Sequence, residues 1–118
     1  MLVGLDVVNV ERFEKLVNNN SFLQKYFTEY EREYIFTRPK PVETLAGLYA
    51  AKEAFLKALG IGIGRGVDLI DIQINHDELG KPFYNVSNYT KLEKFNFNSS
   101  DLSISHTNNV STAICVLI

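Results

Sequence analysis

The sequence is poor in cysteine, in net charge and in long apolar runs. Its one cysteine, Cys115, excludes a disulfide within the chain and favours a reducing, cytoplasmic compartment. Cys115 lies in an apolar segment without a neighbouring histidine or cation, so we expect a core thiol rather than a nucleophile. The formal charge of −2 argues against a general nucleic-acid binder. The N-terminal apolar run is short and meets Asp6 at once, so neither a signal peptide nor a membrane span is predicted.

The length of 118 residues predicts one domain, 1–118, without a linker, an internal repeat or a low-complexity tract. An apolar fraction of 46% is ordinary for a globular protein with a buried core. So small a chain leaves little room for a separate substrate domain. We therefore expect that a deep site would need a second copy of the chain.

The order of the elements predicts an α+β fold in which an antiparallel sheet packs on one long helix and several short ones. Apolar patterns predict strands over 2–8, 69–75, 83–86 and 102–106, and a last strand that follows Asn109 and forms a hairpin with the one before it. The first of these strands is expected to be buried.

Helix-start signals predict several short helices near the N-terminus. Asn9 is expected to cap the first of them. Ser21 with Gln24, and Thr28 with Glu31, have the spacing of capping boxes and predict two more. This spacing favours a structural role for Glu31.

The longest predicted helix begins at Pro41 or Val42 and runs to about Leu59, where Gly60 is a natural C-terminal cap. A weaker helix is predicted over 87–94.

One face of the long helix combines small side chains with an acid and a base. With Phe55 at the centre of the apolar face, Ala46, Ala50, Glu53 and Lys57 fall on the opposite face, where another molecule could approach the backbone closely. The alternative is that Glu53 and Lys57 form an ion pair on a solvated face, worth about 0.3–0.5 kcal/mol.

Asp6 is an acid inside an otherwise apolar strand, where an unpaired carboxylate would be costly to bury. It caps the turn that follows, or it is a metal ligand. If the fold brings Asp6 to Glu53, the two carboxylates can hold Mg²⁺ beside the Lys57 ammonium, because Mg²⁺ takes oxygen ligands and keeps several waters. Such an arrangement suits chemistry on a phosphate ester or a pyrophosphate.

Other polar features carry weaker signals. Gly60-x-Gly62-x-Gly64 is either a helix cap with a flexible connection or a place where backbone approaches a phosphate; it is not a Walker loop, because it follows a helix. His106 ends an alternating strand and is either structural or at the edge of a pocket. His76, in a turn beside acids, is expected to be exposed.

The order of several short blocks resembles one family over nearly the whole chain, the holo-[acyl-carrier-protein] synthases, which are the short bacterial type of 4′-phosphopantetheinyl transferase. The block around the acid and the base is the most specific. The blocks are Gly4-x-Asp6, Phe27-Thr28-x-x-Glu31, Leu45-Ala46-Gly47, Ala50-Ala51-Lys52-Glu53-Ala54-x-x-Lys57-Ala58-x-Gly60, Gly80-Lys81-Pro82 and Leu102-Ser103-Ile104-Ser105-His106-Thr107.

The resemblance implies an enzyme that moves the phosphopantetheine arm of coenzyme A to a serine of an apo acyl carrier protein and releases 3′,5′-ADP, in support of fatty acid biosynthesis. It implies Mg²⁺ and a homotrimer with coenzyme A bound between subunits. The net charge and the short apolar run predict no nucleic-acid or membrane partner. Asp6 and Glu53 match the metal ligands, and with Lys57 they form the expected catalytic set. The residues expected to contact coenzyme A are Lys52, Lys57, Gly60, Gly62, Lys81, Pro82, His106 and Thr107.

The acidic carrier protein is expected to meet a basic patch on the first helices. Arg12 matches a basic family position there, and Lys15 and Lys25 lie near it in the sequence. For Lys15 and Lys25 the alternative, ordinary surface charge, is equally favoured.

The chain departs from the family pattern at a few positions. Leu48 and Tyr49 stand where many members have Arg and Phe or Trp, and Ile61 replaces a threonine. We expect Lys52, Arg65 or Lys81 to replace the missing arginine. The alternatives to a transferase are a metal-dependent phosphohydrolase and a non-catalytic nucleotide-binding module.

Overall fold

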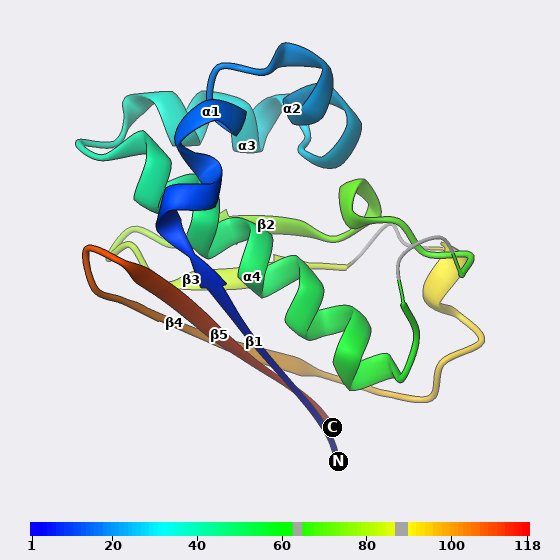
Figure 1. Cartoon of the computed structure of the whole chain (residues 1–118). Helices are drawn as coiled ribbons and strands as arrows, with labels where there is room; N and C mark the ends of the chain where they lie inside the picture. Colours follow the sequence, from blue (N-terminus) through cyan, green and yellow to red (C-terminus); the bar gives the residue numbers. More distant parts are fainter. Residues whose placement is uncertain (63–64, 87–89) are drawn as a thin grey trace.

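The computed structural model describes residues 1–62, 65–86 and 90–118 and confirms the α+β prediction. Helices α1 to α3 gather at one end of the long helix α4, and α4 lies across a three-stranded sheet (Figure 1). In chain order the elements are β1 Leu2–Asn9, η1 Val10–Arg12, α1 Phe13–Leu16, α2 Asn20–Tyr26, α3 Glu29–Thr37, α4 Pro41–Leu59, η2 Leu69–Asp71, β2 Gln73–His76, β3 Pro82–Asn85, η3 Thr90–Leu92, β4 Ser100–His106 and β5 Val110–Leu117.

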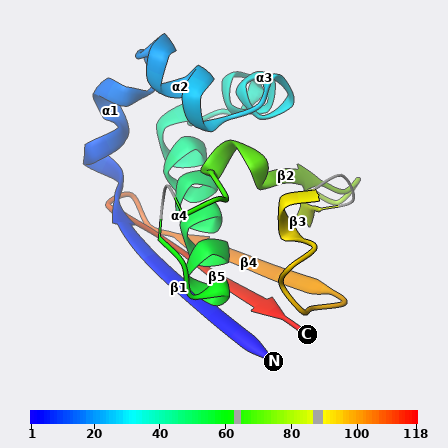
Figure 2. The same ribbon diagram turned by 90° about the vertical axis from the view of Figure 1, so that its right-hand side faces the viewer.

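The main sheet has the strand order β1-β5-β4, with both pairs antiparallel. Ala113 on β5 pairs with Asp6 on one side and Ile104 on the other, so these three residues form one row across the sheet. The predicted hairpin is confirmed, because β4 and β5 join through residues 107–109. β2 and β3 form a separate antiparallel pair beside α4, next to β4 and away from β1 (Figure 2).

Helix α4 follows local rules at both ends. Pro41 occupies its first turn, and Gly60 ends it in the left-handed conformation with φ 77°. Gly4 of β1 lets the sheet approach closely, since an added Cβ would lie 1.8 Å from the Ala54 carbonyl oxygen and 2.6 Å from the Ala58 nitrogen. The protein's own sheet therefore lies against α4 where we expected room for another molecule; Ala46 and Ala50 are fully buried.

A buried ion pair joins α3 to α4. Lys52 Nζ donates to Glu31 Oε1 at 2.8 Å and to the carbonyl oxygens of Leu69 and Ile72 at 2.9 and 2.8 Å. Glu31 also accepts from the backbone nitrogens of Thr28 and Ile74, so it completes the predicted capping box and ties β2 to α3. Both side chains are fully buried, and the structural role predicted for Glu31 is confirmed.

Two predicted helix caps need correction. Helix α2 is capped by Asn19, whose side chain accepts from the Phe22 nitrogen, and not by Ser21. Asn9 precedes a 3₁₀ turn and makes no side-chain cap bond.

The strand predicted over 69–75 begins only at Gln73, because Asp68 and Asp71 form a capping box around a 3₁₀ turn. Within 87–94 the described part contains the 3₁₀ turn η3; residues 87–89 lie outside the described residues.

The face of the main sheet that points away from α4 is apolar. Val3, Leu5 and Val7 on β1 and Ile114 on β5 are 39–61% exposed. The predicted burial of β1 is therefore correct only for alternate residues in the single chain. Cys115 points inward and is fully buried, as expected. Among the described residues, no helix is both long and apolar enough to cross a bilayer.

Candidate active site

The carboxylate of Asp6 lies on the inner face of β1, against α4. Lys57 Nζ donates to Asp6 Oδ1 at 2.8 Å. The second oxygen, Oδ2, is buried and has no hydrogen-bond partner within the described parts of the chain. A buried carboxylate oxygen without a donor is costly, so the geometry leaves one strong ligand position open.

Glu53 lies on α4 one turn before Lys57 and is half-buried. The turn of the helix places both on the flank that faces β1. Two carboxylates and an ammonium thus share one flank of α4. Asp6 and Glu53 supply the oxygen donors that Mg²⁺ prefers, and the open oxygen of Asp6 fits such an ion.

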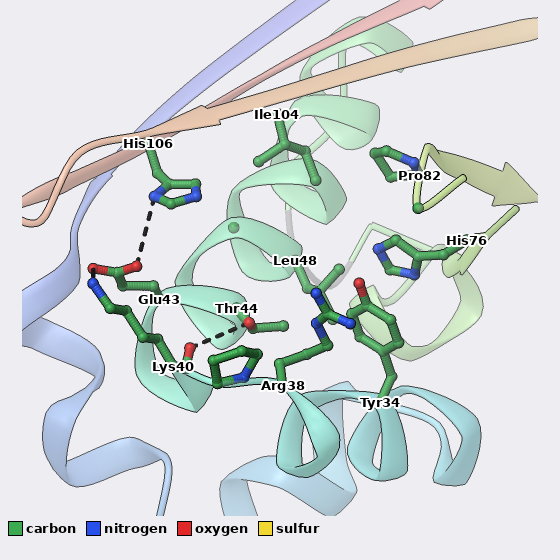
Figure 3. Close-up of a pocket in the computed structure, with 13 residues that line it drawn as sticks. Tyr34, Arg38, Lys40, Glu43, Thr44, Leu48, His76, Pro82, Ile104 and His106 are labelled. Carbon is green, nitrogen blue, oxygen red and sulfur yellow. Dashed lines mark hydrogen bonds and ion pairs between the residues drawn. The ribbon is translucent and has the colours of Figure 1, made fainter. Parts of the chain in front are cut away.

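A cavity of about 400 Å³ lies on the other flank of α4, between the ends of α3, β3 and β4 (Figure 3). Its lining combines aromatic, apolar and cationic side chains. The lining residues are Tyr34, Arg38, Pro39, Lys40, Glu43, Thr44, Gly47, Leu48, His76, Gly80, Pro82, Ile104 and His106.

One wall of this cavity is a stack of flat groups. Tyr34 and His76 lie 3.8 Å apart at the ring centroids with an angle of 8° between the planes, and the Arg38 guanidinium lies 5.4 Å from the Tyr34 ring centroid. Burial first, and then the charge of Arg38, lower the pKa of His76, while Asp77 opposes them. His76 is therefore half-buried and stacked, and the prediction of an exposed turn residue is wrong.

The opposite wall carries a small charge network. Glu43 lies between two bases, with His106 Nδ1 at 3.7 Å and Lys40 Nζ at 3.9 Å (Figure 3). Leu48 and Ile104 form apolar surface between the walls. Flat faces with cations at the rim suit a ligand that has a planar ring and anionic groups.

The cavity and the carboxylates lie on opposite flanks of α4. Gly47 meets Ile104 of β4, where an added Cβ would lie 3.2 Å from the isoleucine Cγ2. Lys57 meets Asp6 of β1. Strand β5 lies between β4 and β1, so Ile104 and Asp6 are about 10 Å apart across the sheet.

Comparison with known proteins decides the family. The model of the 4′-phosphopantetheinyl transferase superfamily matches residues 2–115. The chain belongs to this superfamily. A holo-[acyl-carrier-protein] synthase of Clostridium botulinum is 43% identical over 98% of this chain and 94% of its own length. One of Nautilia profundicola is 38% identical over 99% of both chains.

Solved structures agree with the family assignment. The holo-[acyl-carrier-protein] synthase of Helicobacter pylori, in complex with coenzyme A, superposes with a TM-score of 0.89 at 31% identity, over 99% of this chain and 100% of that one. The Neisseria meningitidis enzyme gives 0.86 at 35% identity, over 100% and 99%.

The residues predicted to contact coenzyme A do not lie together in this superfamily member. Pro82 and His106 line the cavity. Lys81 is exposed and contacts Asp101 at 3.3 Å, and Thr107 Oγ1 accepts two backbone hydrogen bonds in the β4–β5 turn. Gly60 and Gly62 lie with Ile61 and Arg65 in a separate hollow.

The prediction that Lys52 contacts the cofactor is wrong for this structure. Its ammonium is fully buried, and its three bonds to Glu31, Leu69 and Ile72 use all its protons. Lys52 therefore cannot replace the missing arginine at position 48.

Most cavity residues were not predicted from the sequence, among them the polar and aromatic side chains of Tyr34, Arg38, Lys40, Glu43 and His76. Arg38 and Lys40 flank Pro39 in the turn between α3 and α4. Two cations beside a proline could have indicated from the sequence that this turn binds an anionic ligand.

The predicted partner-binding residues lie on consecutive elements, with Arg12 in η1, Lys15 in α1 and Lys25 in α2. The Arg12 guanidinium packs over the rings of Phe13 and Tyr49, at 5.3 and 5.0 Å from their centroids.

Proposed function

We propose that this chain transfers the 4′-phosphopantetheine arm of coenzyme A to a serine of an apo acyl carrier protein, in the cytoplasm and in support of fatty acid biosynthesis. Membership of the superfamily and the full-length similarity to holo-[acyl-carrier-protein] synthases support this function. The observation that carries it is the contact between Lys57 and Asp6 beside an open carboxylate oxygen, with Glu53 on the same flank.

The 400 Å³ cavity is the place we propose for the nucleotide end of coenzyme A. The relative from Helicobacter pylori is a complex with coenzyme A. In this chain, Pro82 and Ile104 offer apolar surface to a planar base, and Arg38, Lys40 and His106 offer donors to phosphate oxygens.

Asp6 and Glu53 would hold Mg²⁺, which, when bound, neutralises charge on the pyrophosphate. We assign Glu53 as the base that takes the proton of the attacking serine hydroxyl. The serine oxygen forms a bond to the β-phosphorus, and the bond from this phosphorus to the bridging oxygen breaks. The Lys57 ammonium stabilises or protonates that oxygen as 3′,5′-ADP leaves.

A homotrimer would complete the site. Because the cavity and the carboxylates flank α4 on opposite sides, one coenzyme A molecule can reach both if it lies between two copies. The apolar outer face of β1 and β5 is a surface that such an assembly would bury. Val7→Asp, at a position 61% exposed on this face, is expected to give monomers in light scattering. Leu79→Asp, at a 96% exposed position in the β2–β3 turn, is the control and should leave the assembly intact.

Mass spectrometry of an apo acyl carrier protein incubated with this chain, coenzyme A and Mg²⁺ tests the function. The expected result is a mass gain of one phosphopantetheine arm, which disappears with EDTA or with Asp6→Ala. Glu53→Gln is expected to lower turnover by about 100-fold or more. Release of free phosphopantetheine without a carrier would favour a hydrolase, and binding of coenzyme A without transfer would favour a binding module.

A further inference from the structure

The hydroxyl of Tyr49, on α4, contacts Arg12 of η1. Arg12 Nη2 donates to Tyr49 Oη at 3.3 Å, although the two residues are 37 positions apart. The guanidinium carbon also lies 5.0 Å from the centroid of the Tyr49 ring. Arg12 thus contacts both the ring face and the hydroxyl of Tyr49. A guanidinium can make both contacts because it is planar and has several donors, whereas a lysine ammonium cannot.

The Tyr49 ring is fixed by its own packing. It is 7% exposed and lies tilted against Phe13 at 5.1 Å and Phe22 at 6.3 Å between ring centroids. Its hydroxyl therefore keeps a constant direction, whereas the guanidinium of Arg12 is at an exposed position.

Glu53 follows Tyr49 by one turn on α4, so the two side chains share a flank. Burial raises the pKa of Tyr49, the hydrogen bond from Arg12 lowers it, and the charge of the Glu53 carboxylate raises it. The phenol oxygen accepts from Arg12, and its own proton remains available to an acceptor on the same flank.

We infer that Tyr49 is a positioning residue whose hydroxyl fixes the direction in which Arg12 meets the acidic carrier protein, relative to Glu53. The inference rests on the proposed transferase function and on Arg12 as a docking residue. The carrier must present its serine at Glu53 while its acidic surface contacts Arg12, so the distance between the Arg12 guanidinium and the Glu53 carboxylate matters. The packed ring of Tyr49 fixes this distance.

Steady-state transfer with varied carrier and saturating coenzyme A tests the inference. Tyr49→Phe removes only the hydroxyl and keeps the packed ring, so the melting temperature should stay close to that of the wild type. The KM for the carrier is expected to rise about three- to tenfold, the size of one typical intramolecular hydrogen bond, while the KM for coenzyme A is unchanged. Tyr30→Phe, at an exposed tyrosine on α3, is the matched control and should have no effect.

Arg12→Lys keeps the charge but loses the planar donor set, so it should raise the KM for the carrier as much as Tyr49→Phe does. In the double variant the two effects should not add, since both break the same contact. Additive effects, or an unchanged carrier KM in Tyr49→Phe, would overturn the inference. An unchanged carrier KM in Arg12→Gln would also overturn it, because Arg12 would then not dock the carrier. Absence of transfer by the wild type would instead reject the proposed function.

Discussion

Lys57 donates a 2.8 Å hydrogen bond to one oxygen of Asp6, while the other oxygen of the same carboxylate is buried without a partner in the described residues. The ammonium is half-exposed and the carboxylate is nearly buried. The Lys57 ammonium can therefore reach a ligand from the solvent side, while the unpaired acceptor, Asp6 Oδ2, lies on the buried side of the pair. Neither group is arranged as in an ordinary surface ion pair.

Lys57→Met is expected to lower turnover by about 100- to 1,000-fold, the size typical for removal of one donor to a developing anion. The free energy of unfolding should fall by about 1–3 kcal/mol, because the nearly buried Asp6 carboxylate loses the donor to its Oδ1. Lys91→Met is the matched control, since Lys91 makes a 2.9 Å contact with Asp71 and is similarly exposed. Equal effects of the two substitutions on turnover would contradict a catalytic role for Lys57.

Gly4→Ala is expected to destabilise the protein by about 3 kcal/mol or more, because the new methyl group would overlap the backbone of α4 at Ala54 and Ala58. Gly47→Ala, on the α4 face that meets β4, is the control. There the nearest atom belongs to the side chain of Ile104, and the change should stay within about 1 kcal/mol. Urea unfolding measures both, and similar midpoints would argue against close packing at Gly4.

Lys52→Met is expected to cost about 3–5 kcal/mol, since it leaves the buried Glu31 carboxylate without its counter-charge. Thermal or urea unfolding measures the loss. The protein that remains folded should keep its KM for coenzyme A, because Lys52 does not reach the cavity. Normal stability combined with a raised KM for coenzyme A would instead indicate that Lys52 contacts coenzyme A.

The histidine in the cavity wall predicts a pH dependence of stability. Burial, with the charge of Arg38, lowers the pKa of His76 from 6.5 in the folded chain. The unfolded chain therefore takes up a proton at a pH where the folded chain does not. The contribution of His76 is fully present above pH 6.5 and is lost as the pH falls through the lowered value. His76→Phe keeps a flat ring against Tyr34 and removes the proton, so its unfolding free energy should fall less between pH 7 and pH 5. Parallel curves for the two proteins would contradict this.

Local rules predicted the parts of the fold that depend on neighbours in the sequence. Thr28 with Glu31 satisfies backbone groups within one turn, Gly60 caps the last carbonyls of α4, and Pro41 lacks an N–H that the first turn would leave unpaired. Spacing alone therefore identifies all of them. The cap of α2 was misplaced because several residues near Asn19 are competent caps, and spacing does not rank them. The 3₁₀ turn at 69–71 was missed because it preserves the apolar alternation of a strand.

The residues that the sequence could not assign have distant partners. Lys52 stands in the block that resembles a cofactor site, but its counter-ion is 21 positions away on α3. The stack of Tyr34 and His76 joins α3 to β2. Such contacts depend on how the helices pack, which a pattern of neighbours does not encode.

The separation of cavity and carboxylates by α4 has a genetic consequence. If each site is formed by the carboxylate flank of one copy and the cavity flank of another, two inactive variants can complement each other. One variant would carry a substitution at Asp6 and the other at His106, and both would be expressed together. In a random mixture of equal amounts, about one site in four would combine two intact flanks. Each variant alone would have none. Two inactive alleles would then support growth as a pair, and the recovered fraction would report how the subunits share their sites.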